Sequence, residues 1–341
     1  MGGHGSGILH AEIDENGCLT QVALAATTPS PSFVAQHPSL PVLYAVGEKE
    51  ETLRAFRIGA DGGLTPLGGP AAAGAAACHV AIDPDGRFAV VACWGSGEVL
   101  VYALDAATGA ITGRTDAAPA RAPYAGVPES DMVAPRPDYA PRMSRAHYAQ
   151  FLPDGRVLTI DLGFDLARVW RFASASATLV LDHEVVFPYG VGPRHVAAAA
   201  DGRLYVSCEY AVAVFVLTPG ADGRYAIAGS SPLRAAPREA GEYAAHLSLS
   251  DDESLLYATV RGSNIVAVLA VVEGGAPQPL GEVPSGADWP RHHYARGDRL
   301  YVANQLSDEV TVFALGADGV PGEILQRVPA GSPTAVVPTS R

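Results

Sequence analysis

The residues of this sequence best suited to chemistry are a histidine, an arginine and a glutamate at repeated positions of the chain. Arg194 and Glu209 lie near the two ends of the stretch GPRHVAAAADGRLYVSCEY, and His147 begins the related stretch HYAQFLPDGRVLTIDL. A histidine exchanges a proton near neutral pH, and the planar guanidinium of arginine matches a carboxylate or a phosphate. Together with a carboxylate, these groups would allow acid–base chemistry on an anionic small molecule.

The fold must bring these residues together, and an internal repeat indicates which fold does so. Each copy contains a short strand, a turn of the DG type, a second strand, a polar turn and a third strand, and looser segments between copies suit a fourth, outer strand. The copies are residues 33–58, 79–104, 147–172, 195–217, 246–271 and 292–315. They start 46 to 51 residues apart, except for one interval of 68. Such a period, with several strands per unit, predicts an all-β propeller with one blade per copy.

The two ends of the chain would supply a seventh blade. The N-terminal strands GILHAEI and CLTQVALA need partners, as does the C-terminal SPTAVVPT, so we expect these strands to close the ring and hide its edges. No apolar strand precedes GGHGSGI, whereas other copies have LYVSC or LYVAN there. This predicts an open position in the blade, with residues 1–7 loosely placed at its rim. We expect one seven-bladed domain over residues 1–341, with the Pro- and Ala-rich segment 116–145 as a long loop between blades.

Aligning the copies on the aspartate of the turn defines two sets of side chains. Seven residues before it, the first set contains Cys78, His147, Arg194, Ala245 and Arg291. Six residues before it, the second set contains His79, Tyr148, His195, His246 and His292. Because neighbouring residues of a strand point to opposite faces, we expect the variable first set to approach the channel or active face. The uniform second set should pack into the blades through a repeated structural hydrogen bond.

A second alignment, on the end of the strand after the turn, defines a further ring of positions. Its members are Glu48, Trp94, Leu162, Glu209, Arg261 and Gln305. A charged residue directly after an apolar strand is also common on a solvated edge. Glu209 stands out because it belongs to the same copy as Arg194. We expect Arg261, Arg291, Glu48 and Gln305 to bind substrate around a centre that His147, Arg194 and Glu209 share.

The repeats, and phrases such as GPRHVAAAADGRLYVSCE, AHYAQFLPDG and WPRHHYARGDRLYVANQLSDEVTVF, resemble the seven-bladed propeller lactonase family. That family contains bacterial 6-phosphogluconolactonases and fungal carboxy-muconate lactonizing enzymes. The resemblance covers nearly the whole chain and implies that His147, Arg194 and Glu209 are catalytic. Two positions differ from the family pattern: Val260 precedes Arg261 where an asparagine is usual, and Cys93 replaces another asparagine.

The resemblance implies a lactone hydrolase, most similar to a 6-phosphogluconolactonase, which uses general acid–base catalysis and an arginine anion clamp. Two alternatives stay open: a carboxy-muconate cyclase, which needs the same clamp and a proton donor to carbon, and a non-catalytic scaffold that presents loops to a protein. We expect no cofactor and no metal. Glu48, Asp161 and Asn304 could supply oxygen ligands to calcium, but the nearby arginines would crowd a cation.

Composition narrows the classes of partner. A net charge of −13 disfavours nucleic acid and anionic membranes, but a local arginine cluster can still bind a small anion. The four cysteines, Cys18, Cys78, Cys93 and Cys208, have no CxxC spacing, so we expect reduced, buried thiols. No apolar run approaches the ~18 residues of a membrane span, and the N-terminus lacks the pattern of a signal peptide. We therefore expect a cytoplasmic protein; the oligomeric state is not predicted.

Overall fold

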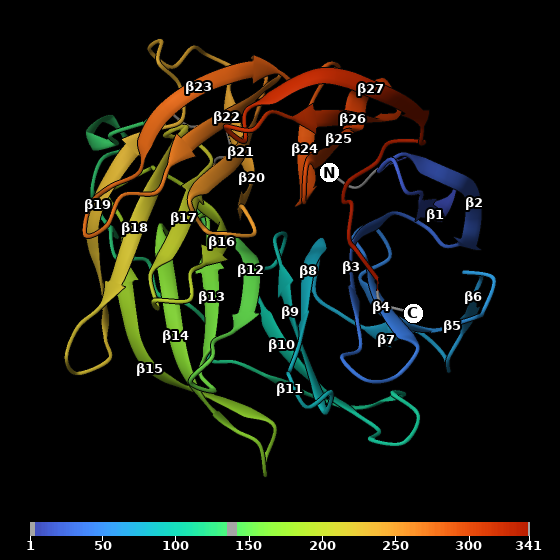
Figure 1. The fold of residues 1–341 in the computed structure, drawn as a ribbon. Helices are drawn as coiled ribbons and strands as arrows, with labels where there is room; N and C mark the ends of the chain where they lie inside the picture. The colour runs from blue at the N-terminus through green and yellow to red at the C-terminus, as the bar shows by residue number, and fades with distance from the viewer. Residues whose placement is uncertain (1–3, 135–141, 340–341) are drawn as a thin grey trace.

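Six sheets of short antiparallel strands surround a common axis in the computed structural model, which describes residues 4–134 and 142–339 (Figure 1). Each sheet runs from an inner to an outer strand in chain order, and we number these sheets blades 1 to 6. Blades 1 to 3 contain β3 (Pro31–Gln36), β4 (Val42–Gly47), β5 (Thr52–Ile58), β6 (Leu64–Pro66) and β7 (Ala71–Ala72); β8 (Ala77–Ile82), β9 (Phe88–Cys93), β10 (Val99–Leu104) and β11 (Ile111–Asp116); and β12 (Ala146–Phe151), β13 (Val157–Asp161), β14 (Leu166–Ala173) and β15 (Thr178–Val186). Blades 4 to 6 contain β16 (Pro193–Ala198), β17 (Leu204–Cys208), β18 (Ala213–Pro219) and β19 (Tyr225–Pro232); β20 (Tyr243–Leu249), β21 (Leu255–Arg261), β22 (Ile265–Ala270) and β23 (Gln278–Pro284); and β24 (Pro290–Arg296), β25 (Arg299–Asn304), β26 (Glu309–Leu315) and β27 (Pro321–Pro329). The predicted all-β propeller is thereby confirmed.

A two-stranded sheet, the terminal hairpin, occupies the remaining position of the ring. It consists of β1 (Gly7–Ile13) and β2 (Leu19–Thr27). A repeated contact shows which strands of a blade it represents: Tyr44 Oη donates to the carbonyl of Gly109 in the next blade, and Tyr257 Oη donates to that of Gly319. Tyr301 Oη donates in the same way to Gly17, in the turn between β1 and β2, at 2.8 Å. The hairpin therefore corresponds to the third and fourth strands of a seventh blade.

The C-terminal segment 332–339 lies beside the hairpin without pairing to it. The described residues of this segment form no strand. Thr334 Oγ1 instead donates to the carbonyl of Pro31 at 3.2 Å, and the Val336 backbone N–H donates to His292 Nδ1 at 3.4 Å. The expected closure of the ring by paired terminal strands is thus not seen in residues 4–134 and 142–339. The segment contacts blades 1 and 6 through side chains, through these two hydrogen bonds and through a third, from the Ser332 N–H to Asp308 Oδ1 at 2.7 Å.

A cavity of about 540 Å³ separates β1 from this C-terminal segment. Its walls come from β1, from residues 330–339 and from both neighbouring blades, including Phe33 and Leu43 of blade 1 and Tyr294 and Tyr301 of blade 6. The hairpin contributes two strands to its sheet, whereas every other blade contributes four or more. The seventh position of the ring is therefore incomplete within the described residues, as the sequence pattern predicts.

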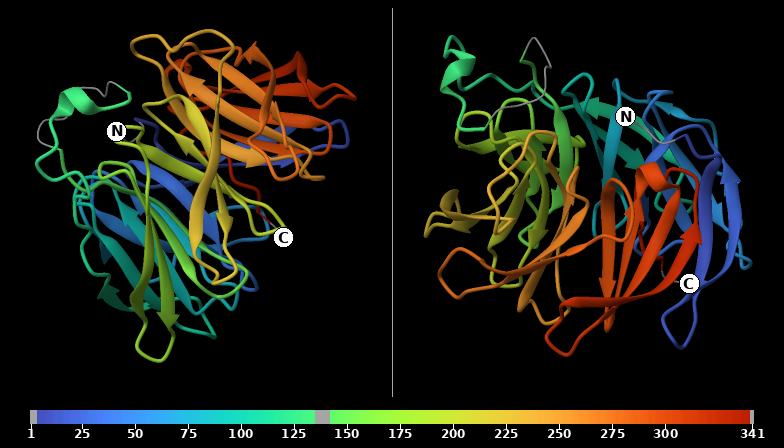
Figure 2. Two further views of the ribbon diagram at one scale, coloured as in Figure 1. Left: turned by 90° about the vertical axis from the view of Figure 1, so that its left-hand side faces the viewer. Right: turned by 90° about the horizontal axis from the view of Figure 1, so that it is seen from above.

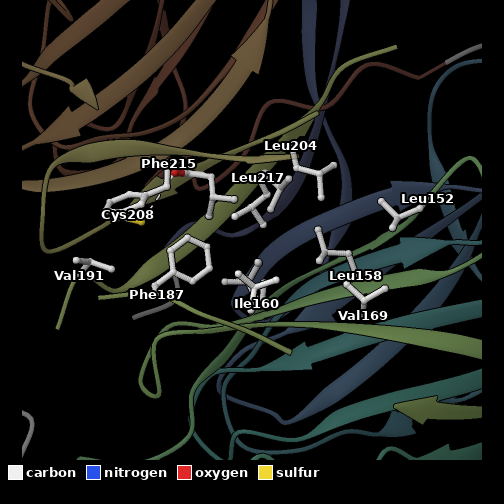
Figure 3. Packing of buried hydrophobic residues seen from close by; sticks show 14 residues of the cluster. Leu152, Leu158, Ile160, Val169, Phe187, Val191, Leu204, Cys208, Phe215 and Leu217 are labelled. Carbon is white, nitrogen blue, oxygen red and sulfur yellow. Dashed lines mark hydrogen bonds between the residues drawn. The ribbon is translucent and has the colours of Figure 1, made fainter. Parts of the chain in front are cut away.

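The cores lie between blades, because both faces of each sheet are covered by its neighbours. Figure 3 shows the cluster between blades 3 and 4, in which Leu158, Ile160 and Val169 face Phe187, Leu204 and Leu217. The middle strands are buried along their whole length, as in VLTID of β13 and LYVSC of β17. Strands buried on both faces read as continuous apolar runs rather than as alternating patterns. The short β-branched runs of the sequence therefore become middle strands.

The long connection between β11 and β12 packs onto blades 3 and 4. Its described part carries a short 3₁₀ helix, η1 (Glu129–Asp131), and projects from the body of the sheets (Figure 2). Tyr124 Oη donates to the carbonyl of Phe187 at 2.6 Å, and the Tyr124 ring stacks on Tyr189 with centroids 4.6 Å apart. Ala134 packs with Leu162 and Tyr210. Of the expected loop 116–145, residues 135–141 lie outside the described residues.

Candidate active site

The inner strands aim the first set of side chains through β-bulges. The register of β12, β16 and β24 shifts around a single residue, and these residues are His147, Arg194 and Arg291. A bulge leaves one residue out of the ladder and redirects its side chain. Strict alternation between the two faces of the strand is therefore lost at the three positions where the site residues stand.

The second set of side chains consequently lies at the axis, and the expectation that it packs inside the blades is wrong. The ring centroid of His195 lies 5.7 Å from that of His79, 5.2 Å from that of His246 and 6.4 Å from that of His292. The four residues belong to four different blades. His195 Nδ1 and His246 Nδ1 are 2.9 Å apart and share a hydrogen bond. The four rings, from four blades, therefore meet at the centre of the propeller.

Glu209 pairs with two arginines from two blades. It directly follows β17, and its Oε2 lies 3.0 Å from Arg194 Nε and 2.8 Å from Arg261 Nη2. All three side chains are buried. Burial by itself raises the pKa of Glu209, but the attraction of Arg261 and Arg194 outweighs burial and lowers this pKa below its ordinary value. The carboxylate is therefore ionised at neutral pH and holds both guanidinium groups in place.

A second charged group lies beside the first. Arg291 Nη2 lies 3.8 Å from Glu48 Oε2, and Arg291 Nη1 donates to Gln305 Oε1 at 3.2 Å. Burial lowers the pKa of Arg291, and the repulsion of Arg261 adds to this effect while Glu48 opposes it. Arg261 and Arg291 also lower the pKa of Arg194 by repulsion, so the three guanidinium groups lie close together, with Glu48 and Gln305 beside Arg291.

His147 is neutral and has an unused nitrogen. It is 6% exposed, its ring centroid lies 5.3 Å from that of His195, and its Nδ1 has no hydrogen-bond partner among the described residues. Burial, followed by the positive charges of Arg194 and Arg291, lowers the pKa of His147 well below its ordinary value. An anion bound to the arginines would offset their charge and raise this pKa again.

The arrangement suits an anionic ligand better than a cation. Three arginines face two glutamates, and the buried Nη1 of Arg194 has no acceptor among the described residues. Burial and the repulsion of Arg261 lower the pKa of Arg194 to about 9, so the guanidinium is still charged at neutral pH. An unsatisfied, buried, charged donor is costly, and a ligand oxygen would remove that cost.

The described residues contain no group of three or more histidine, cysteine, aspartate or glutamate side chains that could hold a metal ion. Asp161, considered above as an oxygen ligand, instead accepts hydrogen bonds from the backbone N–H groups of Arg145 and Phe164 and from the Ser144 hydroxyl. The four cysteines are free thiols. Burial raises the pKa of Cys78 to about 12, so this first-set residue stays a thiol.

Two aromatic residues beside the site were not identified from the sequence. The rings of Tyr243 and Trp289 lie 5.7 Å and 5.5 Å from the guanidinium carbon of Arg261. They stand two residues before Ala245 and Arg291, which are members of the first set. The register of both strands shifts between these residues and the rest of the strand, so alternation along a strand gave no signal for them.

Comparison with known proteins gives consistent matches. The family described as "Lactonase, 7-bladed beta-propeller" matches residues 1–338. The chain is 26% identical over 300 residues to a 6-phosphogluconolactonase of Bacillus subtilis, covering 85% of this chain and 81% of that protein. A solved structure from Lactobacillus plantarum superposes with a TM-score of 0.86 at 25% identity, covering 98% of this chain and 96% of the other. The periplasmic gluconolactonase of Pseudomonas aeruginosa superposes with a TM-score of 0.84 at 25% identity, covering 97% and 94%.

None of the helices in the described part of the chain is long and apolar enough to cross a membrane.

Proposed function

Because the chain belongs to the seven-bladed β-propeller lactonase family, we propose that it hydrolyses a sugar-type lactone at the centre formed by His147, Arg194 and Glu209. The observation that carries the proposal is the presence of two buried groups without a hydrogen-bond partner among the described residues, Arg194 Nη1 and His147 Nδ1, close enough for the charge of Arg194 to lower the pKa of His147. One group donates a hydrogen bond to a developing negative charge, and the other accepts a proton.

The reaction needs three proton and charge movements. His147 accepts a proton from water as the water oxygen bonds to the lactone carbonyl carbon. Arg194 stabilises the carbonyl oxygen as it becomes an oxyanion, a contribution worth roughly 10²–10³ in rate for one such donor. The carbon–oxygen bond of the ring then breaks, and protonated His147 returns the proton to the leaving alkoxide. The product is the open hydroxy acid.

The glutamates and the remaining arginines prepare this chemistry. Glu209 fixes Arg194 and Arg261 by its two short ion pairs, while Glu48 and Gln305 hold Arg291. Each guanidinium has five donors, so Arg261 and Arg291 can also donate to a phosphate or carboxylate of the substrate. Binding that anion raises the pKa of His147 and makes it a better base once substrate is present.

The relatives indicate which substrates to test first. One relative is a 6-phosphogluconolactonase and one structural neighbour is a gluconolactonase. Their substrates by name, 6-phosphogluconolactone and gluconolactone, differ only by a phosphate. A surplus of arginine in the site favours the phosphorylated lactone. A cyclase that closes a carboxy-muconate would use the same clamp, whereas a scaffold has no need for buried, convergent His147, Arg194 and Glu209.

The test uses a pH-stat, which follows proton release from 6-phosphogluconolactone and glucono-δ-lactone and proton uptake with carboxy-muconate, each corrected for its spontaneous reaction. We expect turnover of a lactone, with higher kcat/KM for the phosphorylated one. His147→Gln should abolish turnover, whereas the matched axial variant His195→Gln should retain it in the folded fraction. Turnover of the muconate alone would support the cyclase, and a His147→Gln protein with full lactonase activity would overturn the mechanism.

A further inference from the structure

The rings of two aromatic residues, Tyr243 and Trp289, lie against the guanidinium of Arg261. Tyr243 lies opposite Arg261 in the β20–β21 pair, and Trp289 comes from the residue just before β24. The ring centroids of Tyr243 and Trp289 are 6.1 Å apart, and each lies within 6 Å of the guanidinium carbon. Arg261 beneath them is buried, whereas both aromatic residues are half-buried. The aromatic surface is therefore presented to solvent next to the charged site.

The backbone of Trp289 is held in an unfavourable conformation. Its φ is +65°, in the left-handed region that bulky residues rarely adopt. The Trp289 N–H donates to Asn264 Oδ1 at 2.9 Å, and its carbonyl accepts from the Gln305 N–H at 3.0 Å. The preceding Asp288 is fixed by Asn264 Nδ2 at 2.7 Å and by Ser307 Oγ at 2.7 Å. Strained residues persist where surrounding structure over-determines them, and they cluster at functional sites.

The left-handed backbone recurs in the residues that precede the first strands of three other blades, Ser30, Ala76 and Gly192. The conformation thus belongs to the repeat, and a purely structural role leaves unexplained only the large aromatic ring at this position. A glycine would adopt φ +65° without strain, and Arg261 is already held by Glu209 and by the carbonyl of Ala244 at 2.9 Å. The strain at Trp289 instead places a large, partly exposed ring beside the buried arginines. Aromatic rings bind apolar surface, including the C–H face of a sugar ring, while neighbouring charges bind its polar groups.

We propose that Tyr243 and Trp289 form an aromatic subsite that packs against the carbon face of a cyclic sugar while the arginines bind its anionic group. This inference rests on the proposed function, because it names the substrate class of the same site as a ring carrying an anion. It assigns Trp289 to specificity rather than to proton transfer. The subsite distinguishes a cyclic sugar phosphate from an anion without a ring.

The experiment compares two ligands that cannot be hydrolysed as lactones: glucose 6-phosphate, which carries a ring, and inorganic phosphate, which does not. Binding is measured by calorimetry on the full chain and by tryptophan fluorescence, since the sequence has only three tryptophans. Trp289→Gly removes the ring and relieves the backbone strain. Ala177→Gly is the matched control, because Ala177 also has a positive φ, of +52°, but lies in the turn between β14 and β15.

We expect the wild-type protein to bind glucose 6-phosphate more tightly than phosphate. Trp289→Gly should weaken glucose 6-phosphate binding about tenfold and leave phosphate binding unchanged, and it should raise KM for a lactone more than it lowers kcat. Ala177→Gly should alter none of these. Three outcomes would overturn the subsite: Trp289→Gly weakens the binding of both ligands equally, Trp289→Gly weakens neither, or the wild-type protein does not prefer glucose 6-phosphate to phosphate. A Trp289-dependent preference without any lactone turnover would support the subsite and refute the hydrolase, so the two failures are distinguishable.

Discussion

Acid should destabilise this propeller at pH values where most proteins are still stable. Burial lowers the pKa of His79 and of His293 from 6.5 to about 3. Burial likewise lowers the pKa values of His147, His195, His246 and His292 well below 6.5. All six histidines are thus neutral in the folded protein and take up protons near pH 6.5 in the unfolded chain. Their contribution to stability is fully present above pH 6.5 and is lost as the pH falls toward the folded-state values.

The size of the effect follows from the unfolded-state pKa. At pH 5.5, each histidine that is neutral when folded and has an ordinary pKa when unfolded lowers the free energy of unfolding by about 1.4 kcal/mol. Six of them give an upper limit of about 8 kcal/mol, which is comparable to the whole stability of a typical domain. The charge of Arg194 adds to burial in lowering the folded-state pKa of five of the six histidines. These five therefore stay neutral in the folded protein at lower pH than burial alone would allow.

Urea unfolding at pH 7.5, 6.5 and 5.5, followed by circular dichroism, measures this loss. In His79→Gln the loss between pH 7.5 and 5.5 should be smaller by about 1 kcal/mol, whatever the stability of the variant at pH 7.5. Tyr148→Phe, which alters a second-set side chain whose pKa burial raises above its ordinary value of 10, should lose as much as the wild type. A free energy of unfolding that stays constant down to pH 5.5 would show that the axial histidines are not held neutral in a buried ring.

Further substitutions test the site and the ends of the chain. Arg194→Met should lower kcat by 10²-fold or more with little change in Tm, because Glu209 keeps its ion pair with Arg261; a variant with normal kcat would remove Arg194 from the mechanism. Asp165→Ala should lower the free energy of unfolding in urea by about 3 kcal/mol, because the Asp165 carboxylate accepts from the Gly190 and Gly192 N–H groups. It should also reduce turnover, because the Gly192 carbonyl accepts from the Glu209 N–H at 2.6 Å. Val336→Asp should cost roughly 2 kcal/mol, because Val336 packs against Tyr301 and Val310; an unchanged Tm would show that the C-terminal segment does not support the ring.

The sequence revealed the fold because the repeat carries the same physical pattern six times. Each copy has an apolar middle strand, and four of the six have a glycine of positive φ in the turn before it, as at Gly86 and Gly202, whose φ values are +70° and +88°. Such local rules do not depend on distant parts of the chain. The two alignments also grouped Arg194, Glu209 and Arg261 correctly, because equivalent positions of different blades converge on one axis.

Features that depend on departures from regular strands were not predictable. The bulges at His147 and Arg194 change which side the neighbouring residues face, so counting along the strand placed the axial histidines inside the blades. Closure by a C-terminal strand was expected because ring edges are costly, but side-chain packing of Val336 takes its place. The role of Trp289 depends on a left-handed backbone, for which a tryptophan in the sequence gives no sign.

The incomplete seventh position makes the two joints of the terminal hairpin unequal. Toward blade 6 the hairpin is tied by Gln326, whose side chain makes hydrogen bonds of 2.8 and 2.9 Å to the backbone of Leu19. Toward blade 1 the side chain of His10 lies against Gly62, while the cavity borders both neighbouring blades. We therefore expect the ring to open locally between the hairpin and blade 1 while the contacts between the other blades stay intact. Amide hydrogens of β1 and β2 would then exchange through brief, local openings that leave the ion pairs of Arg194, Glu209 and Arg261 in blades 4 and 5 intact.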